Sequence, residues 1–127
     1  MRKEFIIGII IIVCIIIGNI ITQRYTKKSV EGMNEKLEEL RESVIQQNEK
    51  EAGEKMKDLT EYWNEKYNLL SYYIEHDELE KVGVEMKILN TNIEIKEYEL
   101  AAEKIDKSIF LLEHIEDKNS LTTPNIF

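Results

Sequence analysis

The chain has 127 residues, which is enough for one domain and too short for two of ordinary size. A third of the residues are charged, with one Pro and five Gly, which excludes collagen-like, proline-rich and glycine-linker proteins. The single Cys excludes an intramolecular disulfide framework and a cysteine-based zinc site. The net charge of -8 makes nucleic acid an unfavourable partner.

The strongest signal in the sequence is an uninterrupted apolar run over residues 5–21. The run carries no charge. A helix of this length extends about 26 Å, close to the roughly 30 Å hydrocarbon core of a bilayer. Lys3 and Arg24 flank the run, and their long side chains can reach the headgroups. We therefore expect a single transmembrane helix in contact with membrane lipid, within a basic anchor region of residues 1–28.

Two alternative interpretations of this run are a cleaved signal peptide and a lipoprotein signal. A signal peptide needs small residues at its cleavage site, whereas the run ends in Gly-Asn-Ile-Ile-Thr at residues 18–22. A lipoprotein needs small residues before its cysteine, whereas Ile12 and Val13 precede Cys14. We therefore expect an uncleaved anchor.

The orientation of this anchor is weakly encoded. Arg2 and Lys3 precede the apolar run, and Arg24, Lys27 and Lys28 follow it, so the positive-inside rule gives a near tie. Long C-terminal domains behind a short basic N-terminus are most often exported. We therefore expect the N-terminus in the cytoplasm and the rest of the chain on the outer side of the cell membrane.

Beyond the basic residues, the apolar positions follow helical spacing. The first stretch has apolar residues at alternating intervals of three and four, namely Val30, Met33, Leu37, Leu40 and Val44. This pattern ends in the polar run of residues 46–54, where Gly53 is expected to mark a turn. The short pattern favours a helix packed on other helices over a coiled-coil stalk that dimerises through residues 30–44.

Three further amphipathic segments follow. The second helix is expected to end near Glu75–His76, with Asp77 capping the third helix. The third helix is expected to fray at residues 90–92. Gly83 within it is either a tolerated surface glycine or a close approach to a neighbour. The apolar faces comprise Met56, Leu59, Trp63, Tyr67, Leu70 and Ile74; Leu79, Val82, Met86, Leu89 and Ile93; and Tyr98, Ala101, Ile105, Ile109, Leu112 and Ile115.

These segments predict an all-α protein. We expect one N-terminal transmembrane helix followed by a small up-down bundle of about four helices in two helical hairpins, over residues 29–118. Residues 119–127 are expected to form a non-helical tail because they contain the only Pro, and their apolar Ile126 and Phe127 could dock onto the bundle. A loose repeat pairs residues 71–76 with residues 109–114, at an offset of 38.

Four short motifs occur in a recognisable order. They are Trp63 with Lys66, the block Tyr-Ile-Glu-His-Asp-Glu-Leu at residues 73–79, Leu-Leu-Glu-His at 111–114 and Asn-Ile-Phe at 125–127. With the N-terminal apolar run, they make the chain resemble the clostridial family called domain of unknown function 4363. The resemblance implies a small, membrane-anchored helical protein of Gram-positive bacteria, of the Clostridia, with no assigned activity. It also implies a small multi-span membrane protein as a candidate partner.

The two histidines are the only side chains that titrate near neutrality. If the second and fourth helices run parallel, His76 and His114 lie at one end of the bundle with Glu75 and Glu113, a set that could bind a divalent metal or sense pH. The alternative is that each His contacts the last carbonyls of its own helix. Adjacent Glu-His pairs point about 100° apart, and HExxH spacing is absent, so we expect no metal site, no cofactor and no catalytic residue.

The remaining patterns favour a non-enzymatic protein. The sequence contains no P-loop, GxGxxG, GxSxG or kinase motif. Trp63 and Tyr67 have core spacing, while Tyr62, Tyr72 and Tyr73 could anchor a partner on the outer face. We expect a structural or protein-interaction component at the cell envelope, with a multi-span membrane protein or a second copy of the chain as partner. The alternative is a ligand-, metal- or pH-sensing helical module on the membrane surface.

Overall fold

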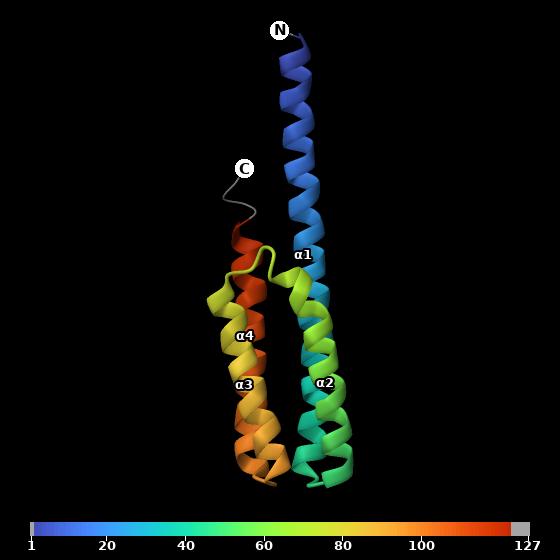
Figure 1. Ribbon diagram of the computed structural model, residues 1–127, viewed down its shortest axis with the longest axis vertical. Coiled ribbons are helices and arrows are strands. Elements are labelled where there is room, and N and C mark those ends of the chain that lie inside the picture. Colours follow the sequence, from blue (N-terminus) through green and yellow to red (C-terminus); the bar gives the residue numbers. More distant parts are fainter. Residues whose placement is uncertain (1, 123–127) are drawn as a thin grey trace.

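The computed structural model describes residues 2–122, and within that range it contains four α-helices and no strand (Figure 1). The helices are α1 (Arg2–Ile45), α2 (Glu49–Leu70), α3 (His76–Glu94) and α4 (Tyr98–Thr122). This confirms the all-α class and the bundle of two hairpins. Four helices are present rather than five, because the expected membrane helix and the first helix of the bundle are one continuous element.

Helix α1 joins the apolar segment to the bundle without a break. Its 44 residues extend about 66 Å, and its N-terminal half stands clear of the other helices (Figure 1). The apolar side chains of residues 5–21 are exposed, and this half is long and apolar enough to cross a membrane. Residues 22–28 contain neither Gly nor Pro, so nothing in the backbone chemistry ends the helix there.

The predicted apolar faces form the core of the bundle. α1 packs against α2 and α4, α3 packs against α4, and α2 and α3 meet less extensively. Buried positions include Val30, Met33, Leu37, Leu40, Val44, Met56, Leu59, Trp63, Leu70, Leu79, Val82, Met86, Leu89, Ile93, Ala101, Ile105, Leu112 and Ile115. The face of residues 30–44 is therefore used within the bundle, which argues against a coiled-coil dimer through it.

The turn between α1 and α2 lies at residues 46–48. Gln47 adopts a positive φ of 54°, and the Asn48 N–H donates to the Ser43 carbonyl at 3.0 Å. This bond gives a partner to one of the carbonyl groups in the last turn of α1. Asn48 then starts α2, because its side chain accepts a hydrogen bond from the Glu51 N–H. Gly53 consequently lies inside α2, so the predicted turn at Gly53 is wrong.

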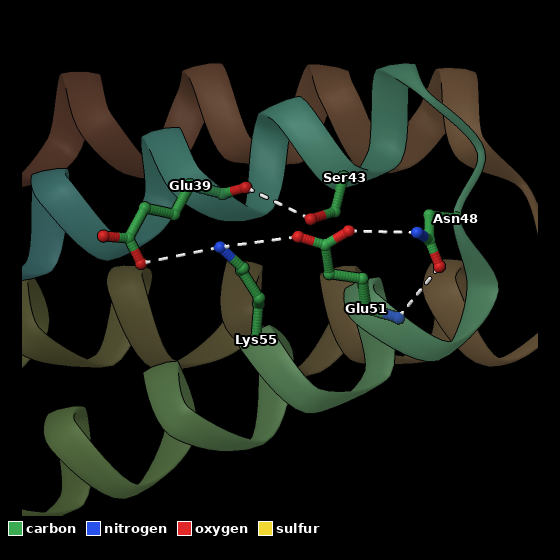
Figure 2. Close-up of polar contacts among 5 residues, drawn as sticks. All are labelled: Glu39, Ser43, Asn48, Glu51 and Lys55. Carbon is green, nitrogen blue, oxygen red and sulfur yellow. Dashed lines mark hydrogen bonds and ion pairs between the residues drawn. The ribbon is translucent and has the colours of Figure 1, made fainter.

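Polar side chains fasten this turn (Figure 2). The Asn48 oxygen accepts from the Glu51 N–H at 3.1 Å, and the Asn48 amide donates to Glu51 Oε2 at 3.0 Å. Lys55 Nζ lies 3.8 Å from Glu51 Oε1 and 3.9 Å from Glu39 Oε2 on α1. Ser43 donates to the Glu39 carbonyl at 3.4 Å. The Asn48 contacts fix where α2 begins, and the Lys55 ion pairs connect α2 to α1.

The turn between α3 and α4 repeats this geometry. Lys96 has a φ of 63°, and the Glu97 N–H donates to the Asn92 carbonyl at 2.8 Å. This bond corresponds to the one from the Asn48 N–H to the Ser43 carbonyl in the first hairpin. Gln47 and Lys96 are 49 positions apart. At the same offset, buried positions pair as Val30 with Leu79, Met33 with Val82, Leu37 with Met86, Leu40 with Leu89, Val44 with Ile93, Ala52 with Ala101 and Met56 with Ile105. The two hairpins are structural repeats at this spacing.

The repeat predicted at an offset of 38 is therefore wrong. Residues 71–76 form the connection between α2 and α3 and the first residue of α3, whereas residues 109–114 lie inside α4. α2 ends at Leu70, and the residue that precedes α3 is Glu75, without a side-chain cap. Asp77 lies in the first turn of α3 instead of capping it.

Two helices extend further than the sequence suggests. α3 continues through residues 90–92 to Glu94, so the predicted fraying does not occur. α4 continues to Thr122, so residues 119–122 are helical and not part of a tail. Ile126 and Phe127, whose apolar side chains could dock onto the bundle, lie outside the described residues.

Two helical glycines differ in their surroundings. A Cβ on Gly83 would meet no atom within 4 Å, which favours the tolerated surface glycine, whereas a Cβ on Gly32 would collide with the Tyr62 hydroxyl. We expect Gly83→Ala to raise the free energy of unfolding by about 0.5–1 kcal/mol, because Ala is the better helix former. Gly32→Ala should lower it by about 1 kcal/mol, because the Tyr62 ring must leave its contacts with Lys36 and Lys66.

Urea titration of both variants checks this contrast. The double variant Gly32→Ala with Tyr62→Ala should be more stable than Tyr62→Ala alone, because the collision is removed and the helix gains an alanine. Equal stabilisation by Gly32→Ala and Gly83→Ala in the wild-type background would contradict the close packing of Tyr62 on α1.

Candidate functional site where the apolar segment meets the bundle

Three segments meet at the end of the bundle that faces the free half of α1 (Figure 1). They are residues 22–29 of α1, the connection at residues 71–75 between α2 and α3, and residues 114–120 of α4. We call this region the junction. It lies directly after Ile21, the last residue of the apolar segment.

A hydrogen-bonded cluster ties the three segments together. The Tyr73 hydroxyl lies 2.7 Å from Thr26 Oγ1 and also donates to the Thr22 carbonyl at 3.2 Å. Asn119 of α4 donates to the same Thr26 oxygen at 3.2 Å, and Thr26 is buried. Burial raises the pKa of Tyr73, and its hydrogen bond with Thr26 opposes part of that rise. The cluster holds the connection at residues 71–75 against the start of α1 within the bundle.

Ion pairs add a second link between α3 and α4. Lys118 Nζ lies 3.2 Å from Glu75 Oε2 and 3.6 Å from Glu78 Oε1. The hydrogen bond to Glu75 and the nearby acidic charges raise the pKa of Lys118. Because Lys118 and Glu75 are largely exposed, this pair contributes little to stability.

The histidines lie at the junction end but do not form a shared site. His76 is the first residue of α3, with its Nε2 3.6 Å from Glu80 Oε2, and His114 Nε2 lies 3.9 Å from Glu78 Oε2. Neither occupies a helix C-terminus, so the predicted contact with terminal carbonyls is wrong. Within residues 2–122, no three His, Cys, Asp or Glu side chains are placed to hold a metal ion.

The candidate carboxylates face different partners. Glu75 pairs with Lys118, and Glu113 is exposed on α4. The adjacent Glu116 is half-buried, and its pKa is raised by burial and by Glu31 on α1, with Lys27 opposing the shift. The acidic groups in and next to the junction are therefore distributed over α1, the connection before α3, and α4, and do not converge on one point.

The aromatic residues divide between core and surface. Trp63 is buried and meets Tyr67 edge-on at a centroid distance of 5.8 Å, which confirms its core role. Tyr62 and Tyr73 are half-buried against α1, so the expectation that they lie free on the outer face is wrong. Tyr72 is 84% exposed, as expected for an outer residue.

Most of the chain matches a known protein family. The model of a family described as Domain of unknown function (DUF4363) matches residues 20–126. The chain belongs to the DUF4363 family. The match covers the whole bundle and begins at Ile20, near the end of the apolar segment. No curated protein and no solved structure matches the chain significantly.

Three of the motifs that carried the DUF4363 resemblance lie within the described residues, where they form packing contacts or connect helices. Lys66 on α2 lies over the rings of Tyr62 and Tyr25, at 5.2 and 5.8 Å from their centroids. The block of residues 73–79 forms the connection into α3, and residues 111–114 lie on α4 beside it. Two of the four motifs, at residues 73–79 and 111–114, therefore overlap the junction, Lys66 contacts Tyr25 within it, and the fourth motif, at residues 125–127, lies outside the described residues.

A buried carboxylate that sequence reasoning missed lies between α3 and α4. Glu85 is 9% exposed, with Lys107 Nζ 3.0 Å from its Oε1 and Lys104 Nζ 3.1 Å from its Oε2. The contact to Oε2 is an ion pair without the alignment of a good hydrogen bond. Burial by itself raises the pKa of Glu85, but the two ammonium groups outweigh it and the pKa is lowered. Glu85 lies on α3 and its two lysines lie on α4, so no local pattern in the sequence indicates that they pair.

Proposed function

We propose that this DUF4363 protein is a single-pass membrane anchor whose helical bundle acts, without enzymatic activity, as a protein-interaction component at the cell envelope. The observation that carries the proposal is the continuity of α1, whose apolar half is exposed and whose polar half is built into the bundle. An exposed stripe of isoleucine is unfavourable in water and favourable in lipid.

Membrane fractionation tests the anchor. We expect Ile12→Lys with Ile16→Lys to move the protein from the alkali-resistant membrane fraction to the soluble fraction, because each Lys near the middle of a span costs about 2.5–3.5 kcal/mol. Val84→Lys with Ile88→Lys is the matched control, since these exposed residues have the same spacing on α3. Loss of the control from the membrane to the same extent, or retention of the first variant, would contradict the anchor.

The interaction role is supported by exposed apolar residues on a strongly acidic bundle. Phe110 on α4 is 68% exposed, and residues 29–127 carry 12 basic and 24 acidic side chains. This charge disfavours nucleic acid, so the proposed partner is a multi-span membrane protein or a second copy of the chain. Purification in mild detergent should recover a stoichiometric partner, and Phe110→Ala should weaken its recovery. Recovery of the chain alone as a monomer would contradict the proposal.

The proposed orientation places the bundle outside the cytoplasm. The short basic N-terminus and the long acidic domain behind the apolar segment support it. Alkaline phosphatase and green fluorescent protein, fused separately after Phe127, should be active and dark respectively. An inactive phosphatase with a bright fluorescent protein would place the bundle in the cytoplasm.

A further inference from the structure

The three longest uncharged stretches of the sequence each have residues at the junction. The three longest stretches without Asp, Glu, Lys or Arg are residues 5–23, 119–127 and 67–74. The first contains the apolar segment, and the third ends α2 and forms most of its connection to α3. Residues 119–122 end α4 beside them, where Gln23 donates to the Ser120 carbonyl at 3.4 Å. The opposite end of the bundle holds instead the ion pair between Lys96 and Glu49.

Tyr73 sets the position of residues 71–74 along α1. Its hydroxyl contacts Thr22 and Thr26, which follow Ile21 by one and five residues. These steps correspond to about 1.5 and 7.5 Å along a helix axis. The polar layer on each side of a bilayer is about 5–8 Å thick. If α1 spans the bilayer with residues 5–21, the connection lies at the depth of the lipid headgroups.

The side chains at this depth suit a lipid interface. The amphipathic side chain of Tyr72 is 84% exposed, and the apolar side chain of Leu69 is 47% exposed. Tyrosine is enriched at the boundary between hydrocarbon and water. Glu75, the first charged residue after this stretch, is drawn toward Lys118 on α4. The exposed basic residues Arg24, Lys27 and Lys28 lie at the same level of α1 and suit phosphate headgroups.

We propose that residues 69–74 form a second membrane contact, in which Tyr72 and Leu69 lie in the headgroup layer of the bilayer that α1 spans. The inference rests on the proposed anchor. A second contact beside α1 fixes the tilt of the bundle and presents the same sides of α3 and α4 to any partner. The occupant of this surface is lipid, and the bundle stands upright on the membrane through two attachments.

Fluorescence quenching in lipid vesicles tests the second contact. The full chain is reconstituted in vesicles of phosphatidylcholine and phosphatidylglycerol that carry a nitroxide on the headgroup or on the acyl chain. An environment-sensitive dye is attached to Leu69→Cys in a Cys14→Ala background, which leaves Tyr72 in place. Dyes at Ile45→Cys and Ile95→Cys, both 61% exposed at the far end of the bundle, are the controls. A dye on native Cys14 reports the anchor itself.

We expect the headgroup nitroxide to quench the dye at residue 69 several-fold more than the dyes at residues 45 and 95. Tyr72→Ser should reduce that quenching while the dye at Cys14 stays strongly quenched by the acyl-chain nitroxide. Equal quenching at residues 69 and 45, with Cys14 still quenched, would overturn the second contact and leave the anchor intact. Absence of quenching at Cys14 would overturn both.

Discussion

Replacing Leu37 by Ala is expected to lower the free energy of unfolding by about 3–4 kcal/mol. Leu37 lies on α1 and is fully buried in the core of the bundle. The substitution removes buried methyl groups and leaves a cavity that rigid neighbouring helices cannot close. A bundle of this size has a total stability of about 5–15 kcal/mol, so the loss is a large fraction of the whole.

Urea titration of the full chain in mild detergent measures this effect. Trp63 is the only tryptophan in the chain and is buried, so its fluorescence reports unfolding of the bundle. Leu100→Ala is the matched control, because it removes the same atoms from a residue of α4 that is 46% exposed, and it should change the stability by about 0.5 kcal/mol or less. Similar losses for the two variants would show that the face of residues 30–44 does not form the core.

The second large effect is expected when Glu85 loses both of its lysines. Lys104→Met with Lys107→Met leaves a buried carboxylate without a counter-charge, which should cost about 2–3 kcal/mol at neutral pH. This loss is at or below the roughly 3–5 kcal/mol typical of breaking a buried ion pair, because Lys107 is half exposed and water can reach part of the site. Lys57→Met with Lys87→Met changes the net charge equally at exposed positions and serves as control.

The pH dependence identifies the carboxylate as the cause. In the wild type the pKa of Glu85 is lowered on folding, so its stabilising contribution is complete at neutral pH and is lost as the pH falls through the folded pKa. Without the lysines, burial raises that pKa, so the penalty disappears on acidification. The stability gap between variant and wild type should therefore narrow in acid. Adding Glu85→Gln should recover part of the loss at neutral pH, and a gap that stays constant with pH would contradict this account.

The apolar faces of all four helices could be predicted because burial imposes a period on the sequence. Val30, Leu37 and Val44 recur on α1 at the spacing that one side of a helix requires, and each is buried. The apolar segment is equally clear in the sequence, because its length and its lack of charge distinguish it from the rest of the chain. The strength of these two signals explains why the sequence alone predicts the fold class correctly.

The turns and the junction could not be predicted with the same success. Gln47 and Lys96 adopt positive φ values that leave no mark on the sequence, whereas Gly53 marks a turn by composition yet lies inside α2. The contacts of Tyr73 with Thr26 join segments 47 positions apart, and ordinary Thr and Tyr residues give no signal for such pairing. Local patterns thus specify faces, whereas tertiary contacts specify where helices end.

We propose that one unbroken helix carries a membrane-spanning segment into the bundle. Nitroxide side chains at successive single-cysteine positions from 10 to 34, in a Cys14→Ala background reconstituted in bilayers, test it by collision with oxygen and with a water-soluble nickel complex. We expect oxygen access without nickel access up to residue 21. Beyond residue 21 we expect a continuous helical period, with minima of access at Thr26, Ser29, Val30 and Met33. Nickel access before residue 21, or a break in the period between residues 22 and 28, would contradict the claim.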